Sequence, residues 1–158
     1  RVDFANPAAS EVGTIRINMR TLQTDNEFRN RAIRGMILQS AQDEFEFAEF
    51  VPSRLEGLPE SVTICQPFTF EVIGALTVRH ITQEITFTTT VTPVSAAWIE
   101  GHAESTVTRT QFELEIPRAP GVADVTDEVL LEIDFVATPG GTVDATPEVG
   151  CSTTNPPL

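Results

Sequence analysis

The chain has 158 residues, of which 41% are hydrophobic and 21% charged, a composition typical of one folded domain and not of a disordered segment. It carries 23 acidic against 10 basic residues, a net charge of −13, which makes nucleic acid and anionic membrane surfaces poor partners. No run of about 18 apolar residues is present, so no transmembrane segment is expected.

The first periodic segment spans residues 12–19, where Ile15, Ile17 and Met19 alternate with polar side chains. An apolar residue at every second position is typical of a half-buried β-strand. The chain opens at Arg1 in a similar rhythm and without a signal peptide, so we expect a mature, cleaved or partial chain.

Residues 24–38 change to a helical period and predict the one helix of the chain. Thr24 stands three residues before Glu27, which is the spacing of a capping box. Apolar side chains then recur on one helical face, namely Phe28, Ala32, Ile33, Met36 and Ile37. Three arginines lie off that face, namely Arg29, Arg31 and Arg34. They suit a solvated helix surface or, as the alternative, contact with a ligand head group or an acidic partner.

Further alternating segments predict the remaining strands, at residues 44–50, 68–79, 84–93 and 128–137. Residues 98–116 contain one more, which runs from Ile99 to Val107. In the segment at residues 44–50, Phe45 and Phe47 point to one side, and Phe50 breaks the phase, which indicates a bulge or a strand end. Residues 52–59 then read as a turn-rich connection. Gly74 lies in the middle of its strand and predicts a bend, as at a barrel corner.

The order of these segments indicates an all-β fold with antiparallel strands and one helix. The short connection at residues 80–83 makes its two flanking strands a hairpin. Long strands joined to their neighbours, without a Cys–Trp–Cys core, favour an up-and-down β-barrel over an immunoglobulin-like sandwich.

Residues 72–87, Val-Ile-Gly-Ala-Leu-Thr-Val-Arg-His-Ile-Thr-Gln-Glu-Ile-Thr-Phe, resemble the central hairpin of the YceI-like, polyisoprenoid-binding family. Four other segments resemble elements of that family in the same order, at residues 22–29, 33–38, 110–114 and 127–135. The resemblance runs over residues 12–137. It implies an eight-stranded lipocalin-like barrel, exported to the periplasm or the cell exterior, that binds long isoprenoid or fatty chains in its lumen without catalytic residues.

The sequence departs from the family pattern in three ways. Ala75 stands where Asp is usual and His80 where Gly is usual, which changes the hairpin turn. The family domain normally begins with two or three further strands, so we expect residues 1–137 to form a partial barrel. The missing strands would come from a protein partner or from a segment absent from this sequence. Residues 138–158 form a Pro-rich tail that the family does not explain and that is a candidate docking arm.

The predicted ligand site is the barrel lumen, lined by inward-facing apolar side chains. This set comprises Ile15, Ile17, Phe45, Phe47, Phe70, Val72, Leu76, Phe87, Leu131, Ile133 and Phe135. Composition alone favours a plain packed core, whereas the resemblance favours an apolar tunnel that holds an isoprenoid chain, such as a quinone tail or a carotenoid. The alternative is a structural or accessory subunit of an exported or membrane-anchored assembly, with a lumen filled by side chains.

Signals for catalysis or a metal are weak. His80 and His102 are far apart in the sequence and have no third histidine, so no metal site is expected. Glu44, Glu46 and Glu49 could pair as catalytic carboxylates, but a solvated strand face explains them more simply. The sequence has neither a nucleophile elbow nor a P-loop, so we expect a protein that is not an enzyme and needs no cofactor.

Cys65 and Cys151 are the two cysteines of the chain. In an oxidising compartment they could form a disulfide that ties the tail to the barrel; otherwise they are unrelated thiols. The spacing of the two cysteines does not distinguish between a disulfide and two unrelated thiols. The expected location is periplasmic or extracellular, as the family resemblance implies.

Overall fold

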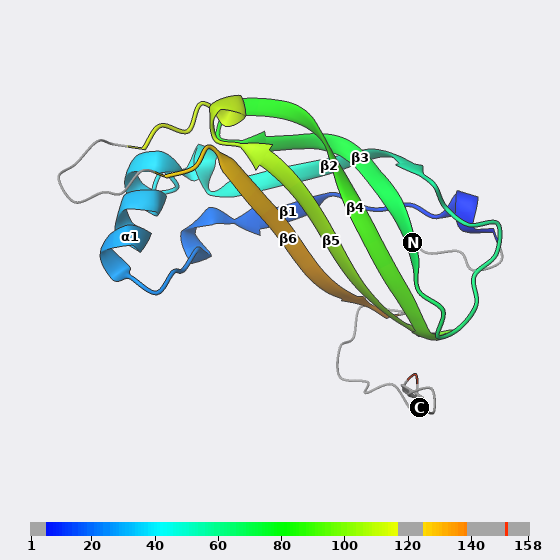
Figure 1. Ribbon diagram of the computed structural model, residues 1–158. Coiled ribbons are helices and arrows are strands. Elements are labelled where there is room, and N and C mark those ends of the chain that lie inside the picture. The colour runs from blue at the N-terminus through cyan, green and yellow to red at the C-terminus, as the bar shows by residue number, and fades with distance from the viewer. Residues whose placement is uncertain (1–5, 117–124, 139–150, 152–158) are drawn as a thin grey trace.

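The computed structural model describes residues 6–116, 125–138 and 151. Its centre is one antiparallel sheet in which each strand pairs with the next along the chain (Figure 1). The strands are β1 (Ile15–Asn18), β2 (Phe47–Glu56), β3 (Phe68–Val78), β4 (Ile81–Ser95), β5 (Trp98–Thr108) and β6 (Glu128–Ala137). The sheet curls into a half-barrel, which confirms the predicted all-β, up-and-down, lipocalin-like architecture with one α-helix.

The half-barrel is open along one side. Within the described residues β1 pairs only with β2, and β6 pairs only with β5. The central strands carry the longest ladders, since β3 and β4 pair from Phe68 opposite Val91 to Val78 opposite Ile81. Arg79 takes a positive φ of 57° in the tight turn between them, at the predicted hairpin. Most of the Pro-rich tail of residues 138–158 lies outside the described residues.

Gly74 lies where β2 and β3 approach each other most closely. A Cβ at this position would lie 2.5 Å from the carbonyl oxygen of Val51 and 2.8 Å from Cα of Pro52. The pairing register shifts between Pro52 and Arg54, on the opposing strand. A glycine is therefore required at this point, where a bulge bends the sheet, as the sequence predicts. The predicted start of the turn-rich connection at residues 52–59 was wrong, because β2 continues to Glu56.

The predicted phase of β2 was also wrong. The strand buries Ala48 and Phe50, and Phe50 lies opposite Ile15 on β1, whereas Phe47 belongs to the other face. The Arg16 guanidinium lies 4.2 Å from the Phe47 ring centroid on that outer face. Phe45 precedes the strand in a 3₁₀ turn, so the Phe45–Phe47 alternation does not belong to one strand.

The predicted helix is present as α1 (Glu27–Ala32), followed by a π-helical turn at Ile33–Ile37. Its predicted cap and apolar face were wrong. Asn26 caps the helix, with its Oδ1 accepting hydrogen bonds from the backbone N–H groups of Phe28 and Arg29. Phe28 is 81% exposed and Met36 is 61% exposed. The helix instead buries Asn30, and the wider π turn shifts the residues after it out of the α-helical period.

Candidate functional site

The lumen of the half-barrel has two parts that differ in how they are filled. Towards α1, Leu76, Ile85 and Val107 from the inner faces of β3–β5 pack in one cluster with Phe112, which is 2% exposed, and none of these four lines the cavity. Towards the β4–β5 turn, the same inner faces enclose a cavity of about 420 Å³. Figure 1 shows α1 at one end of the sheet and the β4–β5 turn at the other. We call these parts the filled end and the cavity end.

Phe112 reaches the filled end from a 3₁₀ turn at Thr110–Phe112, after β5. Gln83 Nε2 donates a hydrogen bond to the Gln111 carbonyl at 3.1 Å. The Thr110 hydroxyl donates to Asp127 Oδ1 at 2.8 Å, and Arg109 Nε donates to the Thr126 carbonyl at 2.8 Å. This turn is therefore fastened both to β4 and to the segment before β6, and it holds the Phe112 ring in the lumen.

Six of the eleven predicted lumen residues line the cavity, namely Ile15, Phe70, Val72, Phe87, Ile133 and Phe135. Leu76 and Leu131 face the same interior but pack at the filled end. Ile17 lies on the inner face opposite Ala48, yet it is 46% exposed because β1 is an edge strand.

Two predicted residues do not belong to the lumen. Phe47 lies on the outer face of β2, as its contact with Arg16 shows. The Phe45 ring lies 6.0 Å from the His80 ring and 5.6 Å from the Arg79 guanidinium, measured to the Phe45 centroid. The prediction for both was wrong because the inward phase of β2 is set by Ala48 and Phe50.

Several cavity residues were missed by sequence reasoning, including Phe50, Leu55, Leu58, Val62, Phe68, Val91, Ile99 and Ala103. Phe68, Val91, Ile99 and Ala103 follow the period-two alternation of β3, β4 and β5 and could have been found from it. Phe50 and Leu55 lie on β2, on either side of the register shift, so one alternation does not predict both. Leu58 and Val62 belong to the connection between β2 and β3, which has no period, so the sequence offers no comparable signal for them.

One wall of the cavity depends on a glycine. Gly101 on β5 lies opposite Phe135 on β6. A Cβ at Gly101 would lie 2.2 Å from Cζ of the Phe135 ring, so the ring occupies the space above the glycine. This arrangement places a large aromatic side chain in the wall of the cavity and compensates for the weak packing of a strand glycine.

The cavity wall is almost entirely apolar. The polar side chains in its lining are Ser10, Glu11, Thr14 and Thr89. Within the part of the chain that the structure describes, Glu11 is the one charged member of the lining, and no arginine reaches it. Such a cavity can hold a hydrophobic molecule, and its described lining brings together no cluster of groups for acid–base or nucleophilic chemistry.

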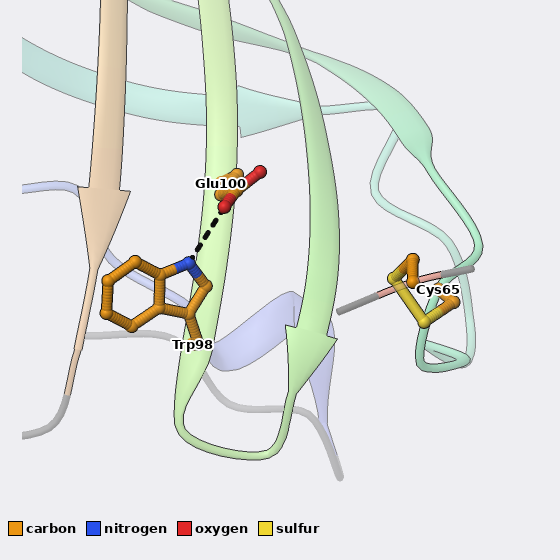
Figure 2. Close-up of a disulfide and its surroundings, with 4 residues drawn as sticks. Cys65, Trp98 and Glu100 are labelled. Carbon is orange, nitrogen blue, oxygen red and sulfur yellow. Dashed lines mark hydrogen bonds between the residues drawn. A yellow bond between two sulfur atoms is a disulfide. The ribbon is translucent and has the colours of Figure 1, made fainter. Parts of the chain in front are cut away.

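A disulfide joins Cys65, in the β2–β3 connection, to Cys151 (Figure 2). The Cys65 backbone N–H donates to the Pro93 carbonyl at 2.7 Å, so this connection is docked on the end of β4. Leu58 and Val62 of the same connection line the cavity. Trp98 begins β5 nearby, and its indole N–H donates to Glu100 Oε1 at 3.0 Å.

The helix arginines do not lie at the cavity. Arg29 forms an ion pair with Asp25, and Arg31 pairs with Glu27. Arg34 Nη1 donates to the Arg20 carbonyl. Because these contacts are local, the structure gives no support to the alternative in which the three arginines hold a ligand head group.

The outer face carries a paired histidine. His102 Nδ1 lies 2.7 Å from Asp134 Oδ1 across β5 and β6. This hydrogen bond raises the pKa of His102 above its ordinary value, against the opposing effect of desolvation, and the negative charges of Asp134, Glu132 and Glu104 add to it. In the described ranges, no three His, Cys, Asp or Glu side chains are grouped as a metal site. The helices in these ranges are too short or too polar to cross a membrane.

The profile of the YceI-like domain matches residues 1–137, and the chain therefore belongs to the YceI-like family. Among curated proteins, none matches the sequence.

Solved structures of low identity share the fold. A YceI protein from Campylobacter jejuni is 14% identical, with a TM-score of 0.63 over 79% of this chain and 70% of its own. Burkholderia cenocepacia BcnA is 20% identical, with a TM-score of 0.64 over 79% of this chain and 73% of its own. A polyisoprenoid-binding domain from Saccharophagus degradans is 14% identical, with a TM-score of 0.59 over 78% of this chain and 72% of its own.

Proposed function

We propose that this protein binds an isoprenoid or other lipid-like molecule in its lumen, as a carrier or sequestering protein and not as an enzyme. The observation that carries this proposal is the apolar cavity of about 420 Å³ at one end of the half-barrel. Its volume lies within the range of about 300–1,000 Å³ that is usual for small-molecule sites. Burial of apolar ligand surface, worth roughly 25 cal/mol per Å², would supply the affinity without covalent chemistry.

The choice of an isoprenoid is supported by the family. The structurally similar domain from Saccharophagus degradans is described as polyisoprenoid-binding. An isoprenoid quinone or a carotenoid belongs to the same class of ligand. We also propose an exported location, periplasmic or extracellular, which the Cys65–Cys151 disulfide supports because such bonds persist in oxidising compartments.

A second candidate function is a subunit of a larger assembly, favoured by the open side of the half-barrel. The edges of β1 and β6 have no partner strand among the described residues. Val129, on the inner face of β6 opposite Val107, is 36% exposed. A strand from a partner chain could cover this side by β-augmentation and complete the barrel.

Native mass spectrometry of the protein from its natural source, followed by solvent extraction, distinguishes the two functions. The matched control is Val91→Phe, which places a ring into the cavity from the inner face of β4. A bound species with isoprenoid fragments, present in the wild type and lost in the variant, is the expected result. A ligand-free chain found only in complex with other proteins would overturn the carrier proposal and favour the assembly subunit.

A further inference from the structure

One buried hydroxyl interrupts the apolar wall of the cavity. Thr89 is 3% exposed and lies on the inner face of β4, in the cavity lining. It stands between Phe87 and Val91 along its strand and lies opposite Phe70 on β3 and Ala103 on β5. Those four neighbours also line the cavity, so the hydroxyl lies in the middle of the wall and not at its rim.

The hydrogen bond that the protein itself offers to the Thr89 hydroxyl is long. Thr89 Oγ1 donates to the Phe87 carbonyl at 3.5 Å, whereas hydroxyl hydrogen bonds are usually about 2.5–3.0 Å long. A buried hydroxyl without a good partner destabilises the folded state. Valine has a similar shape and would avoid this cost, as Val91 does two residues further along the same face. The position therefore suits a hydroxyl that receives a better partner from a ligand.

The charge of the lining restricts what that partner can be. Among the described residues that line the cavity, Glu11 is the one that carries a charge, and none is an arginine. The chain as a whole carries a net charge of −13. A carboxylate or phosphate in the cavity would be desolvated, and the described lining holds no arginine that could compensate its charge.

We propose that the ligand carries a neutral oxygen function, a carbonyl or a hydroxyl, which forms a hydrogen bond with Thr89. The threonine hydroxyl can donate to a carbonyl or accept from an alcohol. This inference rests on the proposed function and narrows it. It favours oxygenated neutral isoprenoids over pure hydrocarbons, which leave Thr89 with only its long bond to the Phe87 carbonyl, and over anionic lipids, for which the described lining holds no arginine.

The test uses the full chain and four probes with the same isoprenoid chain: farnesol, farnesal, farnesene and farnesoic acid. Affinities are measured by displacement of the apolar fluorophore N-phenyl-1-naphthylamine. The variants are Thr89→Val, which removes the hydroxyl, and Thr89→Ser, which keeps it. The control is Thr88→Val, on the exposed outer face of the same strand.

The wild type is expected to bind the alcohol and the aldehyde about 2–10-fold more tightly than the hydrocarbon, which is the net value of one hydrogen bond. Farnesoic acid should bind more weakly than farnesol near neutral pH. Thr89→Val should lose the preference while it binds farnesene as well as before or better. Thr89→Ser and Thr88→Val should keep the preference.

The outcomes separate this inference from the proposed function. Equal affinities for farnesol and farnesene in the wild type, or a preference that survives in Thr89→Val, would overturn the inference and leave apolar binding intact. Failure of all four probes to bind would overturn both. A melting temperature of ligand-free Thr89→Val below that of the wild type would assign the hydroxyl a structural role and also overturn the inference.

Discussion

The filled end and the cavity end of the lumen are built from the same strands and the same alternation, yet one is packed and the other hollow. β4 shows this directly, because Ile85 belongs to the packed cluster and Val91 to the cavity wall, both on one face. The difference comes from the ends of the barrel. A 3₁₀ turn inserts Phe112 at one end, whereas a loop with Leu58 and Val62 borders the cavity at the other. Strand periodicity thus sets which side chains face inward, and the connections decide whether the interior is full.

The largest expected effect on stability is at Phe112, the buried ring of the filled end. Phe112→Ala should reduce the free energy of unfolding by about 3–5 kcal/mol, because it removes a fully buried ring and leaves a void. Urea unfolding followed by circular dichroism measures the change. Phe28→Ala is the matched control, since that ring is 81% exposed, and should change stability by less than about 0.5 kcal/mol. A loss below about 1 kcal/mol for Phe112→Ala would show that the packing of the filled end does not depend on this ring.

A paired substitution tests the comparison itself. Val107 lies in the packed cluster and Val91 in the cavity wall, and both are buried. Val107→Phe should destabilise the protein by about 1–3 kcal/mol through overpacking, whereas Val91→Phe finds space for its ring. Thermal unfolding of the two variants side by side gives the difference. Equal destabilisation would mean that the cavity end collapses in solution and is not hollow.

The smallest expected effect lies on the outer face, outside the lumen, at the His102–Asp134 pair. His102 has a raised pKa in the folded protein because of its bond to Asp134. Its protonated form therefore stabilises the fold fully below the unfolded pKa of about 6.5, and this contribution is lost as the pH rises through the folded pKa.

NMR titration of the two histidines in the chain, His80 and His102, measures this effect. Asp134→Asn should lower the pKa of His102 towards about 6.5. The melting temperature of the wild type should exceed that of His102→Gln by more at about pH 5.5 than at about pH 8.5. An unchanged His102 pKa in Asp134→Asn would contradict the assignment of Asp134 as its main partner.

The sequence predicts the central strands well because their signal is long and uninterrupted. The 68–79 and 84–93 segments become β3 and β4, and the 128–137 segment becomes β6 with Leu131, Ile133 and Phe135 inward. The error on β2 has a physical cause. Two overlapping alternations are present, one through Phe45 and Phe47 and one through Ala48 and Phe50, and only pairing with neighbouring strands selects the second.

The strand residues that line the candidate site could be predicted from the sequence, whereas the residues that close the lumen at its ends could not. Phe70, Phe87 and Phe135 follow from alternation, and all three line the cavity. No periodic pattern indicates that Phe112 enters the lumen, because it belongs to a single turn whose position depends on distant hydrogen bonds. The predicted apolar face of the helix was wrong for a related reason, because the helix buries Asn30, which accepts a hydrogen bond from the Thr24 hydroxyl, in place of the expected apolar side chains.

The disulfide also divides the molecule topologically. Cys65 and Cys151 are 86 residues apart, so β3, β4, β5 and β6 lie within one covalently closed ring, whereas β1, β2 and α1 lie on the free arm before it. A single proteolytic cut inside the ring would leave the two pieces covalently tethered until the bond is reduced, whereas a cut in the arm would leave its fragment held by noncovalent contacts alone. Mechanical extension from the two ends would likewise unravel the arm while the ring remains tied. The four strands that form most of the cavity wall are therefore the part of the chain that the covalent structure keeps together.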